Sequence, residues 1–387
     1  MTKFDEVINR RNTKSVKWDL TEKLFKEKDV LPMWVADMDF ATPQAVQDAI
    51  SKRASHGIYG YTFTDESVHE AIQSWLARRH QWEIDSKWIT FSPGVVPSLH
   101  TIIEAVTQPE DRILIQTPVY PPFFDVIKKH QRTIVENPLQ YNNYRYEIDF
   151  DDFEQQLKNG IKAFILCNPH NPVGRVWTKD ELQRMAELCL QNNTMIISDE
   201  IHADLIYQGH THIPIASLGD QISEQTITCL APSKTFNLAG LQASYIVTPS
   251  EHRKKQIDDQ FTKQGMKMLN TFAITAMEAA YSDGEAWLDD LLTVLQSHKA
   301  YVKDMLETHT SIRVVEPEGT YLLWLDCRNL ELSQEQLKHF MQQEAKVGLN
   351  DGASFGSLGT GFMRMNIACP RPLLEEGINR LIQATQK

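Results

Sequence analysis

Lys234 and Asp199 are the two residues of this sequence whose positions most directly suggest chemistry. Lys234 follows the apolar run "TITCLA", and Asp199 comes directly after the apolar stretch "MIIS". Taken alone, each could be a solvated loop residue, because an unpartnered charge is expensive to bury. A partly buried lysine can also form a Schiff base with an aldehyde, and a desolvated carboxylate is stabilised by a cation such as a protonated pyridine nitrogen. An aldehyde cofactor with a cationic ring, which would accept the electrons of a carbanion, would suit both residues, and the rest of the chain has to decide between this explanation and the ordinary one.

Three further segments that follow apolar runs carry groups suited to the rest of such a cofactor. The amides of Gly94, Val95 and Val96 lie where a strand gives way to a helix, a favourable position for a phosphate. Tyr120 could stack on a planar ring, and Asn171 could donate an amide hydrogen bond to a phenolate oxygen. Each also has an ordinary explanation by itself, as a plain turn, a packed aromatic residue or a turn-rich loop. Their occurrence at successive strand ends favours one shared site.

The elements that must position these residues are seven short apolar runs separated mostly by helical segments. Near-continuous apolar strands of this kind predict an α/β fold with a mainly parallel, seven-stranded sheet covered by helices on both faces. Ligands of such sheets bind at the carboxyl ends of the strands, which is where the candidate residues occur. The predicted strands are "WITFS", "RILIQ", "TIVEN", "KAFILC", "TMIIS", "TITCLA" and "SYIVT".

The helical pattern divides the chain into a large domain and a smaller α+β domain. Thr42 is expected to cap the helix "PQAVQDAISKRAS", and Asp65 the helix "ESVHEAIQSWLARRH". A long helical stretch with a joint at "YSDGEAW" then breaks the alternation of strands and helices. The predicted large domain covers residues 43–284, and the small domain combines residues 1–42 with 285–387.

Composition and charge exclude several classes of partner. The formal net charge of −12 argues against nonspecific binding to nucleic acid or to anionic membranes, which need a positive surface. The N-terminal segment has no apolar core of a secretion signal, and no apolar run is long enough to span a bilayer, so a cytoplasmic protein is expected. Cys167 and Cys229 end apolar runs and are interpreted as buried thiols. His210 and His212 in "GHTH" are interpreted as a surface turn, and no metal site is predicted.

Three motifs in this order, "NPHNPVG", "SDEIH" and "SKTFNLAGL", resemble those of the fold-type I pyridoxal 5′-phosphate (PLP) enzymes of the aspartate aminotransferase superfamily. The resemblance extends over essentially the whole chain. Longer segments, such as "LPMWVADMDF", "ILCNPHNPVGR" and "APSKTFNLAGLQAS", are similar to the PatB/MalY branch of cystathionine β-lyases and related C–S lyases. The resemblance implies PLP as the cofactor, a fold-type I architecture and a homodimer.

The resemblance also implies a role for the residues around the cofactor ring. Lys234 would bond the cofactor and transfer protons, while Asp199 would pair with the pyridine nitrogen. Tyr120 would stack on the ring, and Asn171 would hydrogen-bond its 3-oxygen. His202 stands where many relatives have a tyrosine for that same oxygen.

The remaining implied contacts concern the phosphate and the substrate. Ser233, with the amides that follow Pro93, would hold the phosphate, and Tyr61 would reach the phosphate of the neighbouring subunit. Arg364 in "FMRMN", together with Asn171, would bind the substrate α-carboxylate; otherwise Arg364 is an exposed strand residue. Many relatives have an arginine for the phosphate where this chain has Gln242.

The resemblance implies a carbon–sulfur β-lyase that cleaves cystathionine or another cysteine S-conjugate to a thiol, pyruvate and ammonia. An aminotransferase would use the same residues, and the physical chemistry of the sequence does not separate the two activities. A non-catalytic PLP-binding regulator is the third possibility, because fold does not dictate function. The stretch before the first long helix is too short for the additional DNA-binding domain that such a regulator would be expected to carry.

Overall fold

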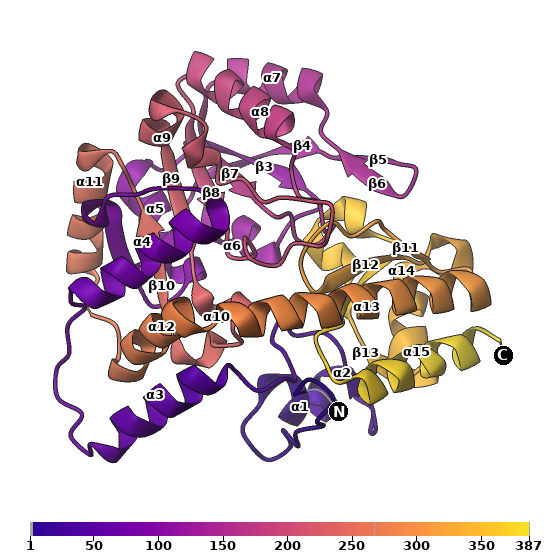
Figure 1. Ribbon diagram of the computed structural model, residues 1–387. Helices are drawn as coiled ribbons and strands as arrows, with labels where there is room; N and C mark the ends of the chain where they lie inside the picture. The colour runs from indigo at the N-terminus through magenta and orange to yellow at the C-terminus, as the bar shows by residue number, and fades with distance from the viewer. Residues whose placement is uncertain (1–2, 267, 387) are drawn as a thin grey trace.

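A computed structural model describes residues 3–266 and 268–386 of the protein. Within this part of the chain, seven strands form one sheet in the order β2-β10-β9-β8-β7-β3-β4 (Figure 1). Strand β10 runs antiparallel to both of its neighbours, and the other neighbouring pairs are parallel. All seven predicted strands are therefore confirmed. They are β2 (Ile89–Ser92), β3 (Arg112–Thr117), β4 (Thr133–Pro138), β7 (Ile161–Cys167), β8 (Met195–Asp199), β9 (Thr226–Leu230) and β10 (Ser244–Val247).

Both faces of this sheet are covered by helices, which explains why its central strands are largely apolar, whereas the edge strand β4 keeps exposed polar residues. Neighbouring strand residues point to opposite faces, so Ile113 and Ile115 join one core while Leu114 joins the other. The first core is completed by helices α5 (Val95–Val106), α6 (Pro121–Lys129) and α11 (Glu251–Lys263). The second core is completed by α7 (Phe150–Lys158), α8 (Lys179–Gln191) and α9 (Asp220–Gln225).

Four helices pack outside these layers. Helix α12 (Thr271–Asp283) contacts α3 (Gln44–Ser55) and α4 (Glu66–His80), and it meets α13 (Glu285–His309) at the predicted joint. In Figure 1, α13 extends from α12 towards the second sheet. The predicted cap of α3 is wrong, because Pro43 is its N-cap and the Thr42 hydroxyl has no hydrogen-bond partner among the described residues. Asp65 is the N-cap residue of α4, as predicted, but its side chain accepts no capping hydrogen bond.

A second, antiparallel sheet forms the core of the C-terminal α+β part, in the order β11-β12-β15-β14. The N-terminal segment joins this part, because strand β1 pairs in parallel with β13. Prediction from the sequence missed β1, β13 and β14, since strands of two residues carry no detectable periodicity. The elements are β1 (Leu31–Pro32), β11 (Arg313–Val314), β12 (Leu322–Asp326), β13 (Val347–Gly348), β14 (Asn350–Asp351), β15 (Phe362–Asn366), α14 (Gln334–His339) and α15 (Arg371–Thr385).

The remaining short elements are helices α1 (Val16–Asp19), α2 (Thr21–Phe25) and α10 (Pro232–Thr235), and the hairpin strands β5 (Gln140–Asn142) and β6 (Arg145–Glu147). All five cysteines are buried free thiols. Across residues 3–266 and 268–386, no helix combines the length and apolar character needed to cross a membrane. The same residues contain no group of three or more His, Cys, Asp or Glu side chains that could hold a metal ion.

Candidate active site

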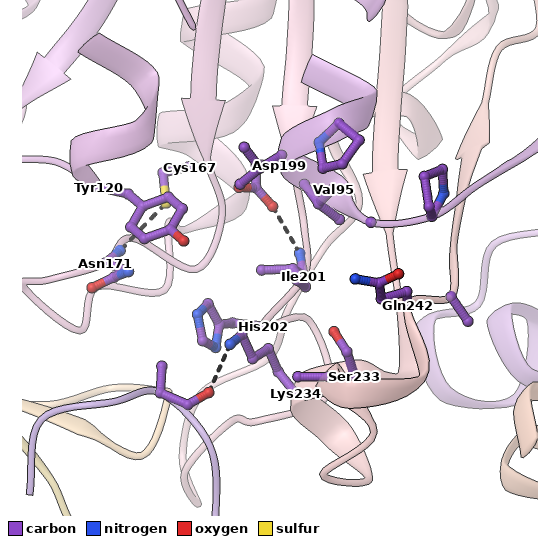
Figure 2. Close-up of a pocket in the computed structure, with 17 residues that line it drawn as sticks. Val95, Tyr120, Cys167, Asn171, Asp199, Ile201, His202, Ser233, Lys234 and Gln242 are labelled. Atoms are coloured by element: carbon purple, nitrogen blue, oxygen red, sulfur yellow. Dashed lines mark hydrogen bonds between the residues drawn. The ribbon is translucent and has the colours of Figure 1, made fainter. Parts of the chain in front are cut away.

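The carboxyl ends of the central strands open into a cavity of about 280 Å³. Figure 2 shows the side chains around it, contributed by several separate segments of the chain. Nine residues predicted for the site line this cavity: Gly94, Val95, Val96, Tyr120, Asn171, Asp199, His202, Ser233 and Lys234. Gln242, identified as a departure from the wider superfamily, lines it as well. Prediction from the sequence missed Ala36, Pro97, Cys167, Ile201, Ala239 and Ala243, which are mostly small or apolar residues and carry no chemical signal of their own.

Lys234 lies on α10, a single helical turn that follows β9 and has Pro232 at its first position. Its Nζ atom donates a hydrogen bond of 2.6 Å to the main-chain oxygen of Ala36. Burial lowers the pKa of Lys234 to about 8, the nearby Arg364 guanidinium acts in the same direction, and Asp199 opposes them more weakly. At neutral pH roughly a tenth of such an amine is uncharged, far more than of an ordinary lysine, and this fraction can attack a carbonyl group or accept a proton.

Asp199 ends strand β8 and is 4% exposed. Its Oδ1 atom accepts a hydrogen bond of 3.2 Å from the amide of Ile201. Burial raises the pKa of Asp199 to about 7, and the Lys234 charge offsets only part of that rise. A cationic group inside the cavity would stabilise the carboxylate, and a protonated ring nitrogen meets that requirement.

Tyr120 and Asn171 approach the cavity from the strand ends beside Asp199 (Figure 2). Burial and the neighbouring Asp199 carboxylate raise the pKa of Tyr120, so its hydroxyl stays protonated. The Asn171 amide nitrogen of the main chain donates to Cys167 Sγ at 3.4 Å, which fixes the loop after β7. The Asn171 side-chain oxygen accepts from Arg364 at 3.0 Å, which leaves the side-chain NH₂ group available to a ligand oxygen.

Arg364 is a buried cation on β15 whose hydrogen bonds go to neutral groups. Its Nη2 atom donates to Asn350 Oδ1 at 2.6 Å and to the Trp34 main-chain oxygen at 3.2 Å. Its Nε atom has no partner, and no carboxylate pairs with it, within the described residues. Burial lowers the pKa of Arg364 to about 10, so it remains charged. A buried guanidinium with donors to spare is suited to bind a carboxylate from solution.

His202 lies between the lysine and arginine sites and is 4% exposed. Burial, and then the charges of Lys234 and Arg364, lower the pKa of His202 to about 3. Its Nδ1 atom has no hydrogen-bond partner in the part of the chain that is described. The neutral ring can therefore hydrogen-bond a ligand without adding charge to the cavity.

The opposite end of the cavity is built from donors suited to an anion. Gly94 is the N-cap of α5, so the N-terminus of this helix lies at the cavity, and Figure 2 shows Val95 and the Ser233 hydroxyl on this side of it. Gln242 closes the turn after Leu241 in the left-handed conformation, with φ 56°. Together with the amine, the carboxylate and the aromatic ring described above, these donors fit a planar aldehyde that carries a phosphate.

Two predicted site residues do not line the cavity: Arg364 lies next to it and hydrogen-bonds the lining residue Asn171, whereas Tyr61 lies away from it. Tyr61 belongs to the segment between α3 and α4 and is 96% exposed. Ile58, Tyr59 and Phe63 of the same segment are also exposed. The predicted role of Tyr61 in a neighbouring subunit stays a prediction.

A second polar cluster lies behind the cavity and corrects the interpretation of "GHTH". His210 is exposed, but His212 is buried and hydrogen-bonds Glu200 at 2.9 Å, so this segment is not simply a surface turn. Close to His212, Asp204 accepts hydrogen bonds from His80 at 2.8 Å and from Thr235 at 2.7 Å. Because Thr235 follows the lysine directly, this carboxylate anchors the helical turn that carries Lys234.

Comparison with known proteins places this site in a family. Residues 28–381 match the model of the family described as "Aminotransferase class I and II". The chain is 43% identical to cystathionine beta-lyase PatB of Bacillus subtilis (strain 168), over 98% of both chains. Cystalysin from Treponema denticola, whose crystal structure contains PLP, superposes with a TM-score of 0.97 at 36% identity, over 100% of this chain and 99% of the other.

A PLP-bound protein of Clostridium difficile 630, assigned provisionally as an aminotransferase, also superposes with a TM-score of 0.97. It is 47% identical in sequence, and the match covers 99% of both chains. This protein is therefore a member of the class I and II aminotransferase family, with the fold-type I architecture of PLP-dependent enzymes.

Proposed function

We propose that this protein is a PLP-dependent carbon–sulfur β-lyase that cleaves cystathionine or other cysteine S-conjugates to a thiol, pyruvate and ammonia. The observation that carries the proposal is the meeting of Lys234 and Asp199 in one cavity, one with a lowered and the other with a raised pKa. Relatives named as cystathionine β-lyases and C–S lyases over the full chain length support the choice of reaction.

Each of these residues has a separate role in such a reaction. When bound, PLP supplies an aldehyde that condenses with the substrate amine and a ring that accepts electrons from Cα. Asp199 keeps the ring nitrogen protonated, and Tyr120 and Asn171 orient the ring. Arg364 binds the substrate α-carboxylate. The Nζ atom of Lys234 would accept the Cα proton as the C–S bond breaks and the thiolate leaves Cβ, and one water would hydrolyse the remaining enamine to pyruvate and ammonia.

An aminotransferase is the second candidate, and a provisional assignment of that kind to a 47% identical protein favours testing it. The two reactions differ in stoichiometry. A β-lyase needs no keto-acid acceptor and releases a free thiol, whereas an aminotransferase consumes a keto acid and leaves the thioether intact.

The experiment is a panel of cystathionine, cystine, S-alkyl cysteines and cysteinyl peptides, assayed for pyruvate and free thiol with and without added keto acid. We expect pyruvate and thiol in equal amounts without an acceptor. Lys234→Ala should abolish both products, and borohydride reduction should place the pyridoxyl group on Lys234. Turnover that requires a keto acid would replace the lyase assignment by the aminotransferase.

We further propose a cytoplasmic homodimer in which Tyr61 reaches the partner's phosphate site. The high exposure of Tyr61 and its apolar neighbours supports this arrangement. Mixing inactive Lys234→Ala with inactive Tyr61→Ala should restore part of the activity through hybrid dimers. A monomer in sedimentation would contradict it. The division into residues 43–284 and the two flanking segments is likewise a proposal, which limited proteolysis would test.

A further inference from the structure

The segment from Trp34 to Phe40, which we call the N-terminal strap, contributes Ala36 to the cavity lining and is held by hydrogen bonds to its main-chain carbonyls. Asn366 Nδ2 donates to the oxygens of Val35 and Asp37, both at 2.6 Å. Asn237 Nδ2 donates to the oxygens of Met38 at 3.0 Å and of Phe40 at 2.9 Å. The strap is therefore anchored by side chains on both sides of the carbonyl between Val35 and Asp37, that of Ala36.

Two strap carbonyls reach side chains of the site: that of Trp34 accepts from Arg364, and that of Ala36 accepts from two donors. The Ala36 oxygen accepts the Lys234 amine at 2.6 Å and the Tyr321 hydroxyl at 3.0 Å. Figure 2 shows the lysine side chain extended towards this oxygen, away from Asp199. The amine thus rests on a neutral acceptor although a carboxylate lies in the same cavity.

Tyr321 is suited to hold this carbonyl in place. It is 1% exposed, and its ring packs edge-on against His202 with a centroid distance of 6.2 Å. Burial raises the pKa of Tyr321 well above its usual range, so the hydroxyl stays protonated and donates. Within the described residues, the Tyr321 hydroxyl donates its hydrogen bond to Ala36 and to no other group.

The choice of acceptor matters for the state of the amine. A carboxylate would favour the ammonium form, whereas a carbonyl that already accepts one hydrogen bond stabilises the ammonium less. An amine that donates one N–H to Ala36 keeps its lone pair for the cavity. This hydrogen bond therefore holds the amine in place and leaves its lone pair able to accept a proton.

We propose that the Ala36 carbonyl, oriented by the Tyr321 hydroxyl, receives the Lys234 amine whenever that amine is not bonded to the cofactor, and that Tyr321 is a positioning residue for proton transfer. The idea rests on the proposed function for its catalytic consequence, but the contact itself does not. The charged and titratable groups that face the amine are Asp37 on the strap, Asp199 and His202 after β8, Arg364 on β15, and Tyr321 before β12.

The test uses the full-length apoenzyme and measures how the Lys234 amine titrates. Competitive labelling with acetic anhydride at a series of pH values, followed by peptide mapping, gives the pKa of that one amine. In Tyr321→Phe, Ala36 loses its second donor and stabilises the ammonium better, so the pKa of Lys234 should rise by about half a unit to one unit. The variant removes a single oxygen, and thermal unfolding checks that it folds.

Tyr207→Phe is the matched control. Tyr207 is also buried, at 3% exposure, and its hydroxyl has no partner among the described residues. This variant should leave the Lys234 titration unchanged. In the holoenzyme, the acidic limb of the kcat profile should move to higher pH in Tyr321→Phe, with KM unchanged.

An unchanged Lys234 titration in Tyr321→Phe, or an equal shift in Tyr207→Phe, would overturn the inference. The labelling result stands even if the wild-type protein proves to be an aminotransferase, because it does not depend on turnover. Failure of the lyase assignment and failure of this inference are therefore distinguishable.

Discussion

Asp199 and Asp204 lie at the two ends of the segment 199–204, and both are buried. They differ in how many hydrogen-bond donors surround each carboxylate. Asp199 faces the cavity and accepts one main-chain hydrogen bond, from Ile201. Asp204 faces the scaffold and accepts hydrogen bonds from the side chains of Trp75, His80 and Thr235. Burial raises the pKa of Asp199 to about 7, whereas for Asp204 the His80 and Thr235 contacts outweigh burial and lower the pKa.

The difference shows how a fold separates a ligand-binding carboxylate from a structural one. A buried charge is tolerated when the protein supplies enough donors, and Asp204 has them. Asp199 lacks them, and under the proposed function its partner is the ring nitrogen of the cofactor, which comes from outside the chain. Burial alone would not distinguish the two residues, since they are 4% and 8% exposed.

The largest expected effect is a loss of turnover on removal of Asp199, the carboxylate that faces the cavity. Asp199→Ala should lower kcat at saturating PLP by about a thousandfold, or about 4 kcal/mol, because the ring nitrogen loses the group that keeps it cationic. Folding of the apoenzyme should be unaffected or improved. Steady-state kinetics with cystathionine measure this effect. Near wild-type turnover would show that Asp199 does not have the assigned role.

For Asp204, whose carboxylate faces other protein side chains, the expected effect is on stability. Asp204→Ala should lower the free energy of unfolding by about 3–5 kcal/mol, because it leaves buried donors on three side chains without an acceptor. Urea denaturation of the apoenzyme measures the loss. Asp259→Ala provides the control, since Asp259 pairs with Lys255 on the surface and its removal should leave the free energy of unfolding nearly unchanged. Equal losses of unfolding free energy in Asp204→Ala and Asp259→Ala would contradict the structural role assigned to Asp204.

The two carboxylates should also respond to pH in opposite directions. The folded-state pKa of Asp199 lies above its ordinary value of 3.8, so apoenzyme stability should fall by about 3 kcal/mol between pH 4 and pH 7, and Asp199→Asn should abolish that fall. The pKa of Asp204 is lowered, so its contribution is present above the ordinary value and is lost as the pH falls below it. Unfolding measured from pH 3 to pH 8 distinguishes the two. A wild-type profile that coincides with that of Asp199→Asn would refute the first part.

The smallest expected effect is on PLP affinity and concerns Gln242, a neutral donor on the side of the cavity proposed to bind the phosphate. Gln242→Ala should weaken PLP binding about three- to tenfold, the value of roughly one hydrogen bond, with kcat at saturating PLP unchanged. Gln242→Arg should tighten binding modestly if the side chain fits beside the phosphate. Titration of the apoenzyme with PLP measures both variants. An unchanged affinity in Gln242→Ala would place its side chain away from the phosphate.

The sequence by itself determined the sheet and the residues at its strand ends. A strand buried on both faces is largely apolar, so the central strands are visible as short apolar runs, and even the edge strand β4 keeps an apolar start. A polar residue directly after such a run, such as Asp199 or Lys234, is therefore conspicuous. Parallel strands also bring their carboxyl ends to one edge, which predicted that these residues would meet.

Only the tertiary structure decided what surrounds those residues. The partner of the Lys234 amine is a main-chain carbonyl, and since every residue has one, no side-chain type in the sequence marks Ala36. Whether His212 is exposed or buried depends on Glu200 across the fold, and the distinction between Asp199 and Asp204 depends on donors from α4 and α10. Local patterns record which residues are apolar and where the chain turns. They do not record which distant group satisfies a buried charge, because that depends on packing between segments far apart in the chain.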